Sequence, residues 1–208
     1  MPMGIASRRG RKVAQITGNA RAILAAERVA LNYLMRMSGI ASYTARFVTL
    51  IAHTQAKVCD TRKTIPGHRA FDKYAVKCGG GSNHRFGLDD ATLIKDNHIA
   101  VCGGVGEAIT RARNWAGHLV AAEVEVDTLA QFREALKASP DVVLRQYGPG
   151  NAGRSSRDQP PSRRTVKLEA SGNVRFEKIK AIAETGVDYI STSKITMAAP
   201  TLDLGLTS

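Results

Sequence analysis

The sequence predicts an α/β protein whose parallel strands form a closed or nearly closed barrel. The first observation is that short apolar or β-branched runs alternate with stretches of helical character from residue 56 to residue 192. The second is that polar residues gather where the predicted strands end, and barrels of this kind carry their reacting groups there. With 208 residues, 43% of them hydrophobic, the chain is long enough for one sizeable core.

Two helices are expected before the first strand. Apolar residues recur at spacings of three and four from Asn19 to Met37, which predicts an amphipathic helix that ends before Gly39. A second helix is expected from Ser42 to Gln55. Strands and the helices that follow them are then expected at 56–60 and 67–81, 91–96 and 104–117, and 119–127 and 128–139. The series resumes with strands at 141–144 and 165–171, a helix at 176–186 and a strand at 188–192.

Residues 145–164 interrupt this series. They are rich in Gly, Pro, Ser and Arg and show no periodicity, although a βα unit should supply a helix at this point. The segment is interpreted as a loop or as disorder. It is either an irregular insert or a stretch translated out of register, with the frame restored near Thr165.

The net charge of +12 is unevenly distributed. Residues 1–13 contain four basic residues and no acidic one, and residues 145–164 contain five basic residues and one acidic one. The rest of the chain is only mildly basic and has few aromatic residues for base stacking, so nucleic acid is not favoured as a partner. No run approaches the ~18 apolar residues of a membrane helix, and no apolar signal-peptide core follows the basic start. A cytoplasmic protein with no membrane partner is expected.

Four cations follow predicted strands or the loops between them and are expected to converge on one face: Arg62, Lys63, Arg85 and Lys95. Arginine binds carboxylate and phosphate oxygens with two parallel hydrogen bonds, and lysine adds a compact charge. Each of these residues alone is best explained as a solvated surface charge. As a group at successive strand ends, they predict a site for a small polyanionic substrate.

Acidic and small polar residues occupy other strand ends. Glu125 shares a strand face with Glu123 and Asp127, where a carboxylate can hold Mg²⁺ or ribose hydroxyls, or stabilise a developing cation. A salt bridge to the neighbouring cations is an equally good reading for Glu123 and Asp127. Residues 171–173, Ser-Gly-Asn, lie between a strand and a helix and suit either a phosphate or an ordinary helix cap. His84 and His98 are acid/base groups or structural residues.

Four segments together resemble the quinolinate phosphoribosyltransferases. They are ERVALNYLMRMSGIAS at 27–42, the stretch from CDTRKT to LIKDNHI at 59–99, EVEVDTLAQFREAL at 123–136, and the stretch from KLEASGN to ISTSKIT at 167–196. The resemblance covers the chain from about Gly18 to Leu206, apart from 145–164. It implies a (β/α) barrel of the type II phosphoribosyltransferase kind, which the interruption at 145–164 would leave incomplete. Residues 1–29 would be the remnant of a truncated N-terminal α/β domain, and residues 30–208 the catalytic barrel.

The resemblance also implies an activity and a set of site residues. Enzymes of this family join quinolinate to phosphoribosyl pyrophosphate with Mg²⁺ as cofactor, and they release pyrophosphate and CO₂ to give nicotinate mononucleotide for NAD synthesis. By motif, Lys63 and Glu125 would be catalytic, and Glu125 would also face Mg²⁺. The substrate-binding set would be Arg28, Thr61, Arg62, Lys63, His84, Arg85, Lys95, Glu125, Ser171, Gly172, Asn173, Thr192 and Ser193.

The family also implies a homodimer or a higher homo-oligomer, because the position of Arg28 reaches the neighbouring subunit's site. Three alternatives stand beside the transferase. One is a catalytically impaired remnant, and another is a paralogue of the same fold such as the molybdenum-transport-associated relative. The third is a basic binding protein.

Overall fold

The computed structural model describes residues 10–146 and 166–207. They form one six-stranded sheet in the order β1-β6-β5-β4-β3-β2, and every strand pairing is parallel. The strands are β1 (Lys57–Cys59), β2 (Ala91–Ile94), β3 (Ala121–Val126), β4 (Val142–Gln146), β5 (Lys167–Ser171) and β6 (Tyr189–Ser191). Among the described residues β1 and β2 are the two edges and do not pair with each other, so the sheet is open, and its parallel strands are consistent with the expected barrel type.

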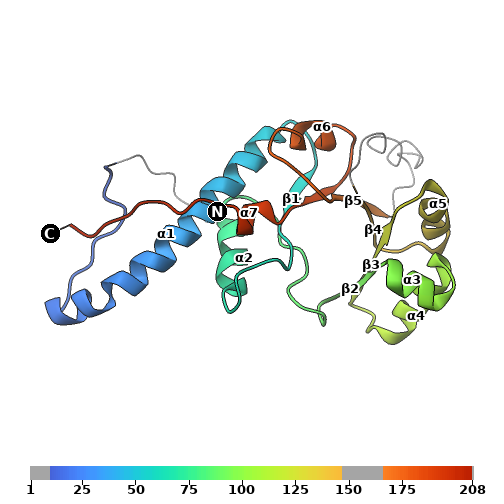
Figure 1. Ribbon diagram of the computed structural model, residues 1–208, viewed down its shortest axis with the longest axis horizontal. Coiled ribbons are helices and arrows are strands. Elements are labelled where there is room, and N and C mark those ends of the chain that lie inside the picture. Colours follow the sequence, from blue (N-terminus) through green and yellow to red (C-terminus); the bar gives the residue numbers. More distant parts are fainter. Residues whose placement is uncertain (1–9, 147–165, 208) are drawn as a thin grey trace.

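The helices follow the strands as the alternating pattern predicts. They are α1 (Ala20–Leu50), α2 (Arg69–Cys78), α3 (Asp96–Cys102), α4 (Val105–Trp115), α5 (Leu129–Ala138), α6 (Ile179–Ala183) and α7 (Lys194–Met197). Figure 1 shows α3, α4 and α5 together at the β2–β4 end of the sheet and α1 and α2 at the β1 end. Buried aliphatic residues on the outward strand face, such as Val58, Val124, Val143 and Ile190, form the core that these helices cover.

The expected break at Gly39 is wrong, because a single helix runs from Ala20 to Leu50. Gly39 is buried in the middle of this helix, and a Cβ atom there would lie 2.1 Å from the carbonyl oxygen of Pro200. The glycine therefore allows the C-terminal segment to pass close to the helix backbone. The backbone N–H of Leu202 also donates to the carbonyl of Met35 at 3.1 Å, which fixes the same crossing.

The beginning of the irregular segment also differs from the expectation. Arg145 and Gln146 continue β4, and Arg145 is in register with Val126 of β3 and Ala170 of β5. Strand pairing on both sides holds these residues extended, although their own composition does not predict a strand. The rest of the predicted loop, from residue 147 on, lies outside the described residues. Within the described part, no helix is long and apolar enough to cross a membrane.

Two short helices, α3 and α7, were not expected from the sequence. α3 begins directly after β2, where the backbone N–H of Lys95 donates to Nδ1 of His98 at 3.0 Å. His98 therefore caps a helix, which matches its structural reading.

The half of α1 that precedes Gly39 and the C-terminal segment both extend away from the sheet (Figure 1).

Candidate functional site

The inner face of the sheet carries polar residues at the carboxyl ends of the strands. Leu144 of β4 is in register with Glu125 of β3 and with Glu169 of β5, so these three side chains share one face. The same alternation brings Glu123 to this face, two residues before Glu125. Although the register row of Glu169 leads to Glu125, the carboxylate of Glu169 lies within 4.8 Å of that of Glu123. Glu123 and Glu169 are therefore taken as the lower level of the inner face, and the residues nearer the strand ends as the upper level.

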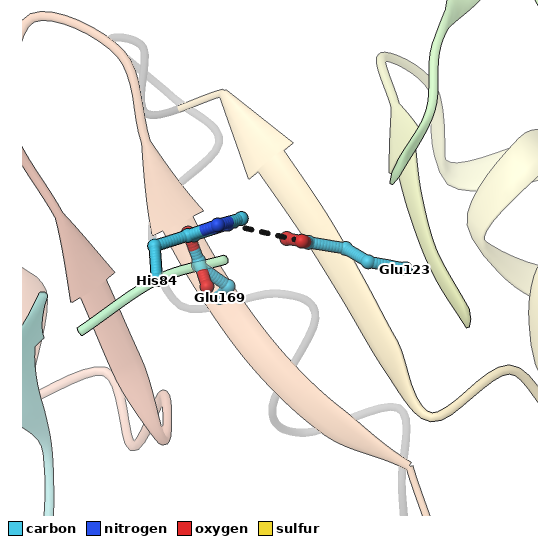
Figure 2. Close-up of side chains that lie close together, drawn as sticks. All are labelled: His84, Glu123 and Glu169. Atoms are coloured by element: carbon cyan, nitrogen blue, oxygen red, sulfur yellow. Dashed lines mark ion pairs between the residues drawn. The ribbon is translucent and has the colours of Figure 1, made fainter. Parts of the chain in front are cut away.

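The lower level holds His84 between two buried carboxylates (Figure 2). Nε2 of His84 lies 3.0 Å from Oε2 of Glu123 and 3.6 Å from Oε1 of Glu169. The two glutamates are each 6% exposed. Glu123 Oε1 and Glu169 Oε1 have no hydrogen-bond partner. His84 was expected among the anion-binding residues, yet here its ring faces two acids.

An ion pair beneath this cluster fixes the position of His84. Nζ of Lys73 on α2 donates to Oδ1 of Asp60 and, at 2.8 Å, to the carbonyl of His84, while Asp60 accepts the backbone N–H of His84 at 2.9 Å. Both charged side chains are buried. Burial raises the pKa of Asp60, although the hydrogen bond from Lys73 opposes this. The sequence reasoning did not find this pair, because nothing in the spacing of Asp60 and Lys73 shows that they meet.

The tautomer of His84 follows from its second ring nitrogen. Nδ1 accepts the backbone N–H of Arg85 at 2.8 Å, so the proton of the neutral ring is on Nε2 and points at Glu123. The ligand atoms of His84, Glu123 and Glu169 lie within 4.8 Å of one another, a spacing that a metal ion can span. A metal-bound imidazole, however, normally donates from its other nitrogen. The ring orientation therefore favours a shared proton over a metal at this cluster.

Glu169 has the most perturbed carboxyl group of the site. Burial, reinforced by the charge of Glu123, raises the pKa of Glu169 from 4.5 to about 7. Two carboxylates this close in a buried environment cannot both ionise easily. Sequence reasoning placed Glu169 at a strand end but assigned it no role, because the alternation along β5 does not show how near Glu123 lies.

The cations of the upper level come from the loops after β1 and before β2. Arg62 and Lys63 are exposed, and the loop is fixed by Arg69, whose Nη2 donates to the carbonyl of Arg62 at 3.2 Å. Thr61 Oγ1 accepts the backbone N–H of Lys63 at 3.0 Å. Burial and the nearby charge of Arg62 lower the pKa of the Arg85 guanidinium. Nη1 of Arg85 also donates to the carbonyl of Ala91 at 2.9 Å, which places this side chain beside the start of β2.

The fourth predicted cation, Lys95, lines a pocket of about 160 Å³ at the ends of β2, β3 and β4. Its Nζ lies 3.5 Å from Oε2 of Glu125, and Nε2 of Gln146 donates to Oε1 of Glu125 at 3.1 Å. Asp96 and Asp127 line the same pocket. Carboxylate oxygens are the ligands that Mg²⁺ prefers, and the pocket is lined by Glu125 and these two aspartates, although both oxygens of Glu125 face Lys95 or Gln146 here.

The predicted phosphate-binding residues lie at the ends of β5 and β6. Gly172 and Asn173 turn the chain after β5 with φ values of 84° and 49°. They do not cap the next helix, because α6 begins at Ile179 with Lys178 as its N-cap. Thr192 and Ser193 follow the neighbouring strand β6, and Thr192 Oγ1 accepts the backbone N–H of Lys194 at 3.2 Å. The two segments are adjacent because β5 pairs with β6.

Arg28 stands apart from the other predicted residues. It is exposed on the half of α1 that extends away from the sheet (Figure 1). Large apolar residues are exposed on the same half, among them Leu24 at 68%, Val29 at 62% and Leu34 at 43%. The loops at the strand ends of its own chain contact α1 further along, where Arg36 donates to the carbonyl of Thr196 at 3.3 Å and Thr196 Oγ1 donates to the carbonyl of Lys63 at 2.8 Å.

Comparison with known proteins identifies the family. The model for the quinolinate phosphoribosyl transferase C-terminal domain matches residues 40–207, and the model for the N-terminal domain of the same family matches residues 1–38. The chain is 46% identical over 198 residues to a probable nicotinate-nucleotide pyrophosphorylase [carboxylating] of Bacillus subtilis, covering 95% of this chain and 68% of the relative. It is 42% identical to the nicotinate-nucleotide pyrophosphorylase of Mycobacterium leprae over 95% of this chain and 69% of the relative.

Solved structures agree with the sequence matches. The nicotinate-nucleotide pyrophosphorylase of Francisella tularensis superposes with a TM-score of 0.83 at 44% identity, over 89% of this chain and 65% of that structure. The enzyme of the same name from Ehrlichia chaffeensis gives 0.80 at 39% identity, over 88% and 66%. The chain spans about two thirds of the length of these relatives, 68% of the Bacillus protein and 65% of the Francisella structure. By sequence and by fold, this chain belongs to the quinolinate phosphoribosyl transferase family.

Proposed function

We propose that this chain transfers a phosphoribosyl group from phosphoribosyl pyrophosphate to quinolinate, with loss of CO₂, to give nicotinate mononucleotide and pyrophosphate. The observation that carries the proposal is the grouping of three cations, Arg62, Lys63 and Arg85, in the loops after β1 and before β2. Cations grouped in this way are stabilised by an anion between them. A pyridine dicarboxylate supplies such an anion.

The substrates fit the remaining charges. Arg62, Lys63 and Arg85 would hold the two carboxylates of quinolinate, and Lys95 would hold phosphate oxygens near Glu125. Ser171, Gly172 and Asn173, with Thr192 and Ser193, would bind the 5′-phosphate at the adjacent ends of β5 and β6. Mg²⁺, held by Glu125 together with the pyrophosphate of the substrate, would neutralise the charge that builds up on the leaving group.

The reaction follows from these positions. The ring nitrogen attacks the anomeric carbon of the ribose as pyrophosphate leaves, and the carboxylate of Glu125 stabilises the positive charge that develops on the sugar. Lys63 and its neighbouring arginines hold the ring so that its nitrogen faces the ribose. Once the ring carries a positive charge, it stabilises the carbanion that forms when the 2-carboxylate departs as CO₂.

The test is to incubate the purified chain with quinolinate, phosphoribosyl pyrophosphate and Mg²⁺ and to measure nicotinate mononucleotide. Lys63→Ala and Arg85→Ala should abolish turnover while circular dichroism and thermal unfolding stay unchanged. Lys137→Ala removes an exposed cation at the end of α5 and serves as the matched control, with turnover retained. A folded wild-type chain that gives no product would contradict the transferase and support the catalytically impaired alternative.

The active species in this proposal is a homodimer or a higher homo-oligomer. Arg28 is exposed on the projecting half of α1, and we assign it to the site of a second copy. The exposed Leu24, Val29 and Leu34 provide apolar surface that a second copy would cover.

A further inference from the structure

Glu123 and Glu169 differ in the partners that surround them. Glu123 Oε2 receives the Nε2 proton of His84 at 3.0 Å, whereas Glu169 Oε1 is 3.6 Å from the same nitrogen and has no hydrogen-bond partner. Because Nδ1 of His84 accepts the backbone N–H of Arg85, only Nε2 has a proton to donate, and it satisfies one carboxylate only. The second buried carboxyl group avoids an unpaired charge by keeping its own proton. In this geometry the protonated group is Glu169.

The other groups around Glu169 do not compete for this role. Burial and the charge of Glu169 raise the pKa of the Cys59 thiol on β1, so the thiol keeps its proton. The hydroxyl of Ser191 on β6 lowers the pKa of Glu169, but burial and the charge of Glu123 outweigh it. The charge of Lys73 is already paired with Asp60. Glu169 is therefore the acidic group of this cluster that is poised to give up a proton.

The cluster lies one layer of side chains below residues that the proposed function assigns to the substrates. Glu123 precedes Glu125 by two residues on β3, and Glu169 precedes Ser171 by two residues on β5. Two residues along a strand span about 6.6 Å, so the acidic pair forms the next layer of side chains below the upper level of the site. A flat ring held by Arg62 and Arg85 would face this layer.

We propose that Glu169 is the general acid that protonates the ring carbon from which CO₂ has left. This assignment rests on the proposed function, because it concerns the second half of that reaction. The C–C bond to the departing carboxylate breaks and leaves its electron pair on C2 of the ring. The O–H bond of Glu169 then breaks, a C–H bond forms at C2, and water reprotonates Glu169 after the product leaves. His84 Nε2 lies 3.0 Å from Glu123 and 3.6 Å from Glu169, so its proton goes to Glu123 and leaves Glu169 without this donor.

The experiment follows the origin of the hydrogen at C2. Wild type, Glu169→Gln and the control Glu107→Gln turn over quinolinate in an equal mixture of H₂O and D₂O, and nuclear magnetic resonance gives the ratio of hydrogen to deuterium at C2 of the product. Glu107 is an exposed residue of α4 paired with Arg111, so its variant should match wild type. Glu169→Gln should lower kcat on the order of 100-fold, with the KM for quinolinate little changed. Its product should also show a different ratio at C2, because water becomes the donor.

Several outcomes would overturn the assignment. An unchanged ratio at C2 in Glu169→Gln excludes Glu169 as the donor, even where the rate falls. If Glu169→Gln does not fold, Glu169→Asp keeps the acid on a shorter side chain, and it should retain the wild-type ratio with a lower kcat. A Mn²⁺ ion bound by wild type and by Glu125→Gln, but lost in Glu169→Gln, would assign the cluster to a metal instead. A wild-type chain without turnover removes the proposed function itself, whereas an active wild type with an unaffected variant removes only the role of Glu169.

Discussion

Lys73 and Asp60 form a buried ion pair that supports the loop carrying His84. The Lys73 side chain is 3% exposed and that of Asp60 is fully buried, and both hydrogen-bond the backbone of His84. Because both members of the pair hydrogen-bond the backbone of His84, they fix the position of His84 relative to Glu123. The stability of the fold and the geometry of the site are therefore coupled here.

Replacing one partner of this pair should be costly. Lys73→Met leaves the Asp60 carboxylate buried without its counter-charge, which is expected to lower the free energy of unfolding by about 3–5 kcal/mol. Urea unfolding followed by circular dichroism measures this. The double variant Lys73→Met with Asp60→Asn should recover part of the loss, since no unpaired charge remains. Glu107→Gln, which breaks an exposed ion pair with Arg111, should leave stability unchanged.

Gly39→Ala tests the crossing between α1 and the C-terminal segment. The new methyl group would lie 2.1 Å from the carbonyl oxygen of Pro200, so one of the two backbones has to move. We expect a loss of about 1–3 kcal/mol in the free energy of unfolding, although alanine is the better helix former. Gly117→Ala is the matched control, because nothing lies within 4 Å of its Cβ position. Equal stability of the two variants would contradict the close approach.

The stability of the protein should depend on pH through Glu169. Its pKa is raised by burial and by Glu123 from 4.5 to about 7, so the folded protein binds the proton more tightly than the unfolded chain. This contribution is fully present below the unfolded pKa and is lost as pH rises through about 7. Stability should thus fall across this window by an amount on the order of 3 kcal/mol. Glu169→Gln should flatten this part of the profile in urea unfolding measured at a series of pH values, and a profile parallel to wild type would contradict the raised pKa.

Variants of α1 should separate oligomers from single chains. Leu24→Glu and Val29→Glu place a charge on residues that are 68% and 62% exposed in the isolated chain. They should shift the sedimentation coefficient toward that of a single chain without lowering the melting temperature. Leu119→Glu changes a residue that is 88% exposed elsewhere and is the control. Sedimentation identical to wild type for all three variants would contradict an interface on this helix.

Complementation between inactive variants tests whether two chains share a site. Arg28→Ala and Lys63→Ala should each be inactive alone. When the two are mixed and allowed to exchange subunits, one site of each heterodimer has both residues intact, so turnover should return. Absence of recovery, with exchange confirmed by mass spectrometry, would place Arg28 outside the partner's site.

Alternation along the chain was enough to predict the parallel α/β architecture. Apolar runs such as ATLI and VVL are strands here, because strands of a parallel sheet covered by helices are rich in apolar and β-branched residues. The end of a helix was harder to predict. Gly39 is a helix breaker by intrinsic propensity, but the contact with Pro200, 161 residues later in the chain, keeps it inside α1.

The candidate site, like the fold, was predictable from the sequence only in part. The sequence by itself determined which side chains reach the strand ends, since parallel strands present alternate residues to one face, and it therefore indicated the cations Arg62, Lys63, Arg85 and Lys95. Only the tertiary structure decided that His84 turns toward Glu123 and Glu169 and that Lys73 pairs with Asp60. Distances between side chains on different strands and loops depend on sheet register and burial, and burial is what shifts the pKa of Glu169.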